Sequence, residues 1–258
     1  MKIGISTASL YPLHTEEALL ETARLPVKNV EIFLNSVSEL EGEVFSCIRE
    51  TVNKYEMNVI SVHPFSSPME SLFLFSSYDR RVTEIMDLYK RYFQMMSRIN
   101  AKIFVVHGVV ATGKCPDERY VERLYALIKA GRDLGVTVAQ ENVGYCKSGR
   151  LEFLQMLSRE LGDFVSFVLD VKQARRANVK PLKIIEELGS KIVHLHLSDS
   201  NYNEECMPIG KGNFDFKSFF AQLKQVGYTG DAVVELYRNN YSEYGELKHC
   251  VDFLEKLL

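Results

Sequence analysis

The sequence lacks the cysteine pattern of a disulfide framework or of a thiolate zinc site. Its 258 residues include five cysteines, an odd number, and no two of them are spaced C-x-x-C. Scattered single cysteines argue against both a disulfide scaffold and a cysteine-ligated metal. We therefore expect all five to be reduced packing residues: Cys47, Cys115, Cys146, Cys206 and Cys250.

Long apolar runs and an excess of one charge are missing as well. No apolar stretch approaches the roughly 20 residues that a membrane span requires, and the N-terminal MKIGISTASLY contains no apolar signal-peptide core. The net charge is −3 and no run of Lys and Arg exceeds two residues, which argues against nucleic acid as a partner. We expect a soluble, cytoplasmic protein with no membrane partner.

No linker rich in Pro, Gly or Ser divides the chain. Short apolar segments instead alternate with longer amphipathic segments from end to end. The expected strands are residues 2–6, 29–33, 58–62, 102–106, 136–140, 165–169, 191–196 and 231–235. The expected helices are residues 15–24, 43–55, 79–99, 117–134, 150–160, 181–187, 216–226 and 244–256. Eight such units predict one α/β domain over residues 1–258, a closed (β/α)8 TIM barrel.

Two connections in this pattern are long, residues 64–78 and residues 199–213. Both follow the carboxyl ends of expected strands, which is the face of a barrel where active sites are built. We expect them to be lids or substrate-binding loops.

One expected strand, IVHLHLSD at residues 192–199, carries two histidines on one face. A period of two places His194 and His196 opposite Val193 and Leu195. If the histidine face lines the inside of a closed barrel, both imidazoles need partners, because a buried imidazole without a hydrogen bond or a metal is costly.

Metal-ligand or acid/base side chains stand at seven of the eight expected strand ends. Strand ends converge in a closed barrel, so we expect these side chains to meet in one pocket. Three carboxylates gathered there would repel one another unless a divalent cation neutralised them. Together with one imidazole they suit Mn²⁺, Mg²⁺ or Zn²⁺. The seven residues are Glu31, His63, His107, Glu141, Asp170, His196 and Glu235.

Taken singly, several of these residues have a simpler interpretation. Glu31 or Asp170 at a strand end is as easily an N-cap of the following helix. His63 precedes a proline and His107 precedes a glycine, so either histidine would also fit a purely structural role in its turn. His194, one pleat deeper than His196, is expected to be a hydrogen-bonded interior histidine.

These residues, in this order, resemble the xylose-isomerase-like TIM-barrel superfamily. That superfamily includes sugar and sugar-phosphate isomerases and epimerases and the endonuclease IV group of repair nucleases. The resemblance covers nearly the whole chain and is most specific in its last third. It rests on the segments ISTASL, VEIFLNS, SVHPFSSP, VVHG, QENVG, VLDVKQA, HLHLSDS, PIGKGNFDFKSFFAQLKQVGYTG and VVELYR.

The resemblance implies a site for one divalent metal ion at Glu141, Asp170, His196 and Glu235. It also implies that Glu141 and Glu235 are the catalytic acid/base pair on opposite faces of a small sugar or polyol substrate. The implied reaction is isomerisation or epimerisation of a sugar or sugar phosphate. It proceeds by proton abstraction next to a carbonyl, through a metal-stabilised enediolate.

One departure from the family pattern separates the alternatives. The usual L-D-x-x-H reads LDVKQ here, so Gln173 replaces a histidine, and an amide is a poor transition-metal ligand. The seventh connection, SNYNEECMPIGKGN, also lacks the aspartate and histidine that the trinuclear nucleases use. An endonuclease IV-like nuclease acting at abasic sites is therefore the weaker alternative. A sugar-binding barrel without catalysis is the other one.

The remaining site predictions concern substrate binding. His63, His107 and Gln173 are expected to hydrogen-bond substrate hydroxyls. Lys211 and Arg238 are expected to hold a phosphate or carboxylate, with solvated surface charge as the competing interpretation. The sequence leaves the oligomeric state open, a homo-oligomer included.

Overall fold

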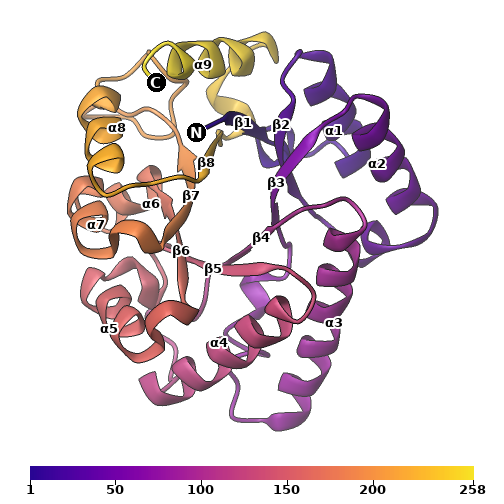
Figure 1. Cartoon of the computed structure of the whole chain (residues 1–258), viewed down its shortest axis with the longest axis vertical. Coiled ribbons are helices and arrows are strands. Elements are labelled where there is room, and N and C mark those ends of the chain that lie inside the picture. The colour runs from indigo at the N-terminus through magenta and orange to yellow at the C-terminus, as the bar shows by residue number, and fades with distance from the viewer.

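The chain folds into a closed barrel of eight parallel strands surrounded by helices (Figure 1). The structure is a computed structural model that describes residues 1–258. Strands follow one another in chain order, and β8 pairs with β1, so no strand edge is left open. The strands are β1 (Ile3–Ser6), β2 (Asn29–Phe33), β3 (Asn58–His63), β4 (Ile103–Val106), β5 (Thr137–Glu141), β6 (Ser166–Asp170), β7 (Ile192–Leu197) and β8 (Asp231–Val234).

Nine α-helices accompany the strands. They are α1 (Thr15–Arg24), α2 (Gly42–Lys54), α3 (Asp79–Ser97), α4 (Asp117–Arg132), α5 (Leu151–Leu161), α6 (Val171–Arg176), α7 (Pro181–Leu188), α8 (Phe216–Gln225) and α9 (Gly245–Glu255). The single (β/α)8 domain and its strands are as the sequence predicted. One helix, α6, was missed, because it is only six residues long and starts directly at the end of β6.

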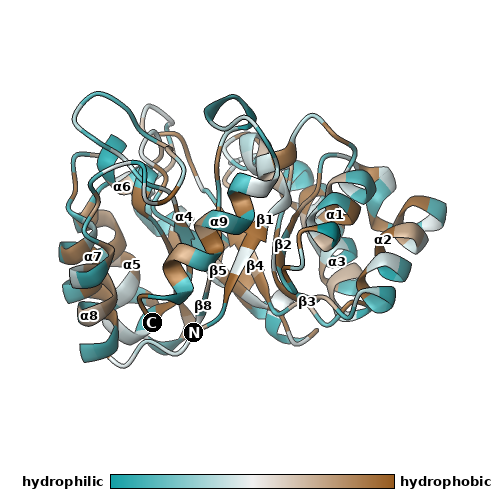
Figure 2. Ribbon diagram, turned by 90° about the horizontal axis from the view of Figure 1, so that it is seen from above, coloured by the Kyte–Doolittle hydropathy of each residue, from teal (hydrophilic) through white to brown (hydrophobic).

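Apolar side chains on the two faces of the strands form two separate clusters. The larger cluster joins the outward strand faces to the helices, as where Phe104 of β4 meets the rings of Tyr89 and Phe93 of α3 at centroid distances of 5.6 and 5.2 Å. A small second cluster, Val105, Ala139 and Val168, lies on the inward faces of β4, β5 and β6. In Figure 2 the apolar colour accordingly concentrates on the central strands, whereas the outer helices carry both polar and apolar colours.

The long connection between β7 and α8 is fixed by one buried carboxylate. Asp199 accepts hydrogen bonds from the backbone N–H groups of Gly210, Gly212 and Phe214, at 2.9 to 3.0 Å. A Cβ atom at position 212 would lie 2.3 Å from Oδ1 of Asp199, so only glycine permits this approach. These hydrogen bonds give the connection between β7 and α8 a defined conformation at the carboxyl end of the barrel. The helices are too short or too polar for any of them to span a lipid bilayer.

Candidate active site at the carboxyl ends of the strands

The barrel brings the predicted strand-end residues together in one buried ring. His63, Glu141 and Asp170 are the last residues of β3, β5 and β6, and His196 is the last but one of β7. His107 and Glu235 directly follow β4 and β8. The side chains of Glu141, Asp170 and His196 are at most 2% exposed, so their charges are almost fully removed from water.

Three of the four predicted metal ligands converge on one point. Nδ1 of His196 lies 3.3 Å from Oε1 of Glu141 and 4.0 Å from Oδ2 of Asp170. Both Nδ1 of His196 and Oδ2 of Asp170 are buried and make no hydrogen bond. The ligand atoms of Glu141, Asp170 and His196 all lie within 4.8 Å of one another. Buried oxygen and nitrogen atoms at this spacing, without hydrogen bonds, fit the coordination of a divalent cation.

Asp170 combines the two interpretations that the sequence left open. Its Oδ1 accepts a hydrogen bond of 3.0 Å from the N–H of Gln173 and so caps helix α6. Its Oδ2 faces the ring. The side chain of Asn142 also pairs with the backbone N–H and C=O of Asp170, at 2.7 and 3.0 Å. These bonds hold the backbone of Asp170 and one oxygen of its carboxylate in place.

Glu235 follows β8, the strand next to that of His196, and meets a lysine that the sequence analysis did not single out. Its Oε2 lies 3.5 Å from Nδ1 of His196 and 3.2 Å from Nζ of Lys172. The lysine side chain is 4% exposed and also lies 3.5 Å from Oδ2 of Asp170. Lys172 therefore supplies a buried positive charge between two of the predicted ligands.

A polar network beneath the ring orients His196. Oε2 of Glu31 lies 3.0 Å from Nε2 of His196 and 3.3 Å from Nε2 of His194, and it also accepts a bond of 2.7 Å from Ser61. Ser6 donates to the other oxygen of Glu31 at 2.9 Å. Glu31 is thus an interior anchor rather than a helix cap, and His194 is the hydrogen-bonded interior histidine that the sequence predicted. Holding Nε2 leaves Nδ1 of His196 to face the ligands.

His63 and His107 face the same carboxylate rather than open solvent. Their Nε2 atoms lie 2.8 Å apart, and the distances to Oε2 of Glu141 are 3.8 Å from His63 and 2.9 Å from His107. These three side chains form a second group with the composition of a metal site. Their use as substrate-binding residues stays a prediction.

The protonation of the ring reflects its crowding. Burial raises the pKa of Asp170 to about 7, helped by the charges of Glu141 and Glu235 and opposed by Lys172. Burial would also raise the pKa of Glu141, but the neighbouring imidazoles of His107, His196 and His63 hold it well below its ordinary value. For His196 burial is outweighed by Glu31 and Glu235, which raise its pKa well above the usual range.

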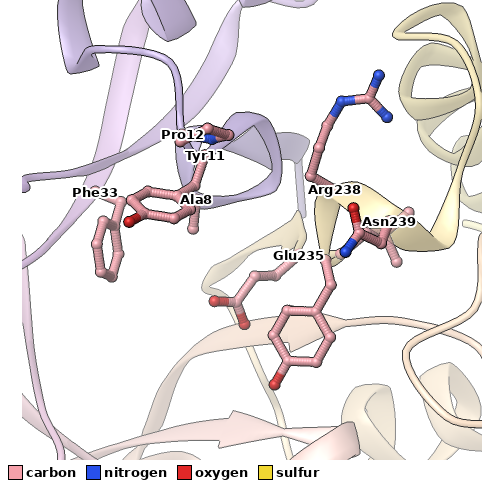
Figure 3. Close-up of a pocket in the computed structure, with 9 residues that line it drawn as sticks. Ala8, Tyr11, Pro12, Phe33, Glu235, Arg238 and Asn239 are labelled. Atoms are coloured by element: carbon pink, nitrogen blue, oxygen red, sulfur yellow. The ribbon is translucent and has the colours of Figure 1, made fainter.

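Two of the remaining predicted residues lie apart from the ligands. The ammonium group of Lys211 pairs with Glu246, and its side chain is 60% exposed. Arg238 donates to the carbonyl oxygens of Tyr241 and Ser242, at 2.9 and 3.4 Å. In Figure 3 its guanidinium points away from the carboxylate of Glu235. Neither cation is directed into the ring in this structure.

Gln173 is buried but turned toward a loop. Its side-chain oxygen accepts a hydrogen bond of 3.1 Å from the N–H of Gly144, just after β5. The structure therefore gives Gln173 a structural contact, and its predicted bond to a substrate hydroxyl stays untested.

The fold and this ring define a class of protein: a (β/α)8 barrel whose strand ends carry a buried set of carboxylate and imidazole ligands. A model of the xylose isomerase-like TIM barrel family matches residues 20–257. The chain belongs to that family, as the sequence predicted.

Similar proteins span the whole chain. An uncharacterised protein of Methanocaldococcus jannaschii is 24% identical over 279 residues, covering 99% of this chain and 90% of the relative. The D-psicose 3-epimerase of Clostridium cellulolyticum, solved with D-tagatose, superimposes with a TM-score of 0.81 at 16% identity, covering 100% and 99% of the two chains. The IolI protein with a bound zinc atom superimposes with a TM-score of 0.78 at 19% identity, covering 100% and 96%.

Proposed function

We propose that this protein is a divalent-metal-dependent sugar epimerase or isomerase. The observation that carries the proposal is the convergence of Glu141, Asp170 and His196, with unpartnered buried ligand atoms, opposite a second glutamate, Glu235. The epimerase that shares the fold supports the reaction class, and the IolI protein with its bound zinc atom supports a metal site in such a barrel.

Glu141, Asp170, His196 and Glu235 are the residues that would hold the cation. A bound divalent ion supplies Lewis-acid stabilisation of the negative charge that develops on a substrate carbonyl oxygen. The protein must provide two groups that move a proton at the carbon next to that carbonyl. Glu141 and Glu235 fit, because they approach His196 from different strands and their neighbours lower the pKa of both carboxyls, which are therefore ionised at neutral pH.

The two glutamates have separate supports, which suits separate roles. His107 lies 2.9 Å from Oε2 of Glu141, and Lys172 lies 3.2 Å from Oε2 of Glu235. One glutamate, as the carboxylate, takes the proton from carbon. The other must first take up a proton from solvent, and it then gives that proton to carbon. Exchange with solvent afterwards returns both glutamates to their starting states. Return to the opposite face of the same carbon gives an epimer, whereas return to the neighbouring carbon gives the aldose or ketose isomer.

The test is proton exchange at carbon. Metal-loaded protein is incubated in D2O with D-tagatose, D-psicose and D-fructose, and deuterium incorporation and new isomers are followed by NMR. We expect exchange with at least one ketose. The variants Glu141→Gln and Glu235→Gln should each lose roughly 10²- to 10⁴-fold in rate, the usual contribution of a positioned acid or base.

Metal content separates the alternatives. Elemental analysis should give one equivalent of a divalent ion per chain, lost in His196→Ala. Two or three zinc ions, filling the His63, His107 and Glu141 group as well, together with cleavage of abasic DNA, would replace this proposal with the nuclease alternative. Tight sugar binding that persists without exchange on every ketose would leave a sugar-binding barrel.

A further inference from the structure

A cavity of about 620 Å³ opens beside Glu235, between the connections that follow β1 and β8. Its size is that of a pocket for a drug-sized ligand. Figure 3 shows the Glu235 carboxylate reaching into the space that it shares with Tyr11 and Phe33. Glu235 also lies 3.5 Å from His196, so this residue belongs both to the cavity wall and to the ring.

The walls of the cavity are mainly apolar. Ala8, Tyr11 and Pro12 line it from the first connection, Phe33 from the end of β2, and Leu236 from the chain after β8. An unsubstituted sugar placed here would leave several hydroxyl groups without hydrogen-bond partners, which is costly. An apolar or aromatic group would instead gain from burial and from contact with the rings.

The nearby cations are already engaged. The Arg238 guanidinium donates to two carbonyl oxygens and lies 4.8 and 5.2 Å from the ring centroids of Tyr241 and Tyr244. The ammonium group of Lys172 lies between Asp170 and Glu235. Arg238 and Asn239 line the cavity together with Glu235, but the only cation among them already donates to carbonyl oxygens. A carboxylate without a free cation beside it disfavours a phosphate group.

We infer that the substrate is an uncharged sugar that carries an apolar or aromatic substituent, and that this substituent occupies the cavity while the sugar reaches the ring past Glu235. The inference rests on the proposed function and names its substrate class. The matched probes are phenyl β-D-glucoside and methyl β-D-glucoside. Neither has a carbonyl, so their binding is measured without turnover.

The experiment is calorimetric titration of the metal-loaded protein with each glucoside. We expect the phenyl glucoside to bind at least tenfold more tightly than the methyl glucoside. Ala8→Leu, which fills the cavity, should reduce that ratio to less than threefold. Tyr202→Ala is the matched control, because Tyr202 is 92% exposed and does not line the cavity, and it should keep the full ratio. Thermal unfolding of both variants establishes that they are folded.

Three binding results would overturn the inference. They are equal affinities of the two glucosides for the unmodified protein, a phenyl preference that survives Ala8→Leu, and tighter binding of glucose 6-phosphate than of glucose that is lost in Arg238→Gln. A dimer that dissociates in Tyr11→Ser would overturn it too, because a second copy of the chain would then cover the cavity. Failure of deuterium exchange with the phenyl preference intact would defeat the proposed function alone.

Discussion

The side chains beneath the ring of ligands are apolar in one half of the barrel interior and polar in the other half. One pleat below Glu141 and Asp170, the interior is filled by the apolar cluster of Val105, Ala139 and Val168, which offers no hydrogen bond. Below His196 the interior is instead polar and contains Glu31, Ser6, Ser61 and His194.

This difference explains which ligand atoms are satisfied. The polar half fixes His196 through Nε2 and leaves only Nδ1 for the site. The apolar half leaves Oδ2 of Asp170 without a hydrogen bond, and burial there raises the pKa of this carboxyl to about 7. A bound cation would therefore be stabilised mainly by the charge of the carboxylates above the apolar half. Its imidazole ligand would already be oriented by the polar half.

The largest effect is expected on the apolar side, in Asp170→Asn. The amide oxygen can still accept from the N–H of Gln173, so the cap of α6 remains, but one charged ligand atom is lost. We expect the affinity for Mn²⁺ to fall by more than about 100-fold, beyond the range typical of outer partners of metal ligands. Calorimetry measures it, and an affinity within tenfold of the unmodified protein would contradict a ligand role for Asp170.

A smaller effect is expected on the polar side, in Glu31→Gln. This change keeps a hydrogen-bond acceptor for Ser61 but removes the charge that holds His196. Loss of such an outer partner typically costs 10- to 100-fold in metal affinity, and we expect a value in that range. If Glu31→Gln weakened Mn²⁺ binding more than Asp170→Asn does, Asp170 would not be a ligand that Glu31 only supports from the polar half.

The pH dependence of metal binding should report the raised pKa of Asp170, which lies above the apolar half. Below about pH 7 Asp170 holds a proton in the metal-free protein, because its pKa is raised, and a cation must displace that proton. We expect Mn²⁺ affinity to fall roughly tenfold per pH unit below pH 7 for this proton. His196, whose pKa is also raised, adds a second displaced proton that extends the dependence above pH 7.

Titrations at pH 6, 7 and 8 in buffers of different ionisation enthalpy would count the protons released. Affinity that stayed constant over this range, with no proton release, would mean that neither group is protonated in the metal-free site.

The strands could be predicted because each depends on a local sequence pattern, and the ring could be predicted because its residues stand at the ends of those strands. Alternation identifies the strands, and barrel closure then brings their ends together whatever the chain separation. Lys172 was missed because it lies on a six-residue helix too short to show a period, although a lysine two residues after the strand-ending Asp170 was a readable signal.

Lys211 was expected to hold a phosphate or carboxylate, with solvated surface charge as the competing interpretation. Its side chain is 60% exposed and its ammonium group pairs with Glu246, 35 residues further along the chain. A partner at such a separation follows from the packing of α9 against the barrel and not from any pattern in the surrounding sequence.

Gln173 gives the smallest expected effect and the sharpest test of where the ring stops. The structure holds its side-chain oxygen on the N–H of Gly144, which ties the chain after β5 to helix α6. Gln173→Ala should therefore cost about 1 kcal/mol of stability, the usual worth of one hydrogen bond, which lowers Tm by roughly 2–4 °C for a chain of this size. Mn²⁺ affinity should change less than about threefold, since the amide contacts no unpartnered ligand atom. A normal Tm combined with a large loss of substrate affinity would instead place the Gln173 amide on a substrate hydroxyl, and the ring would then extend one helical turn beyond Asp170.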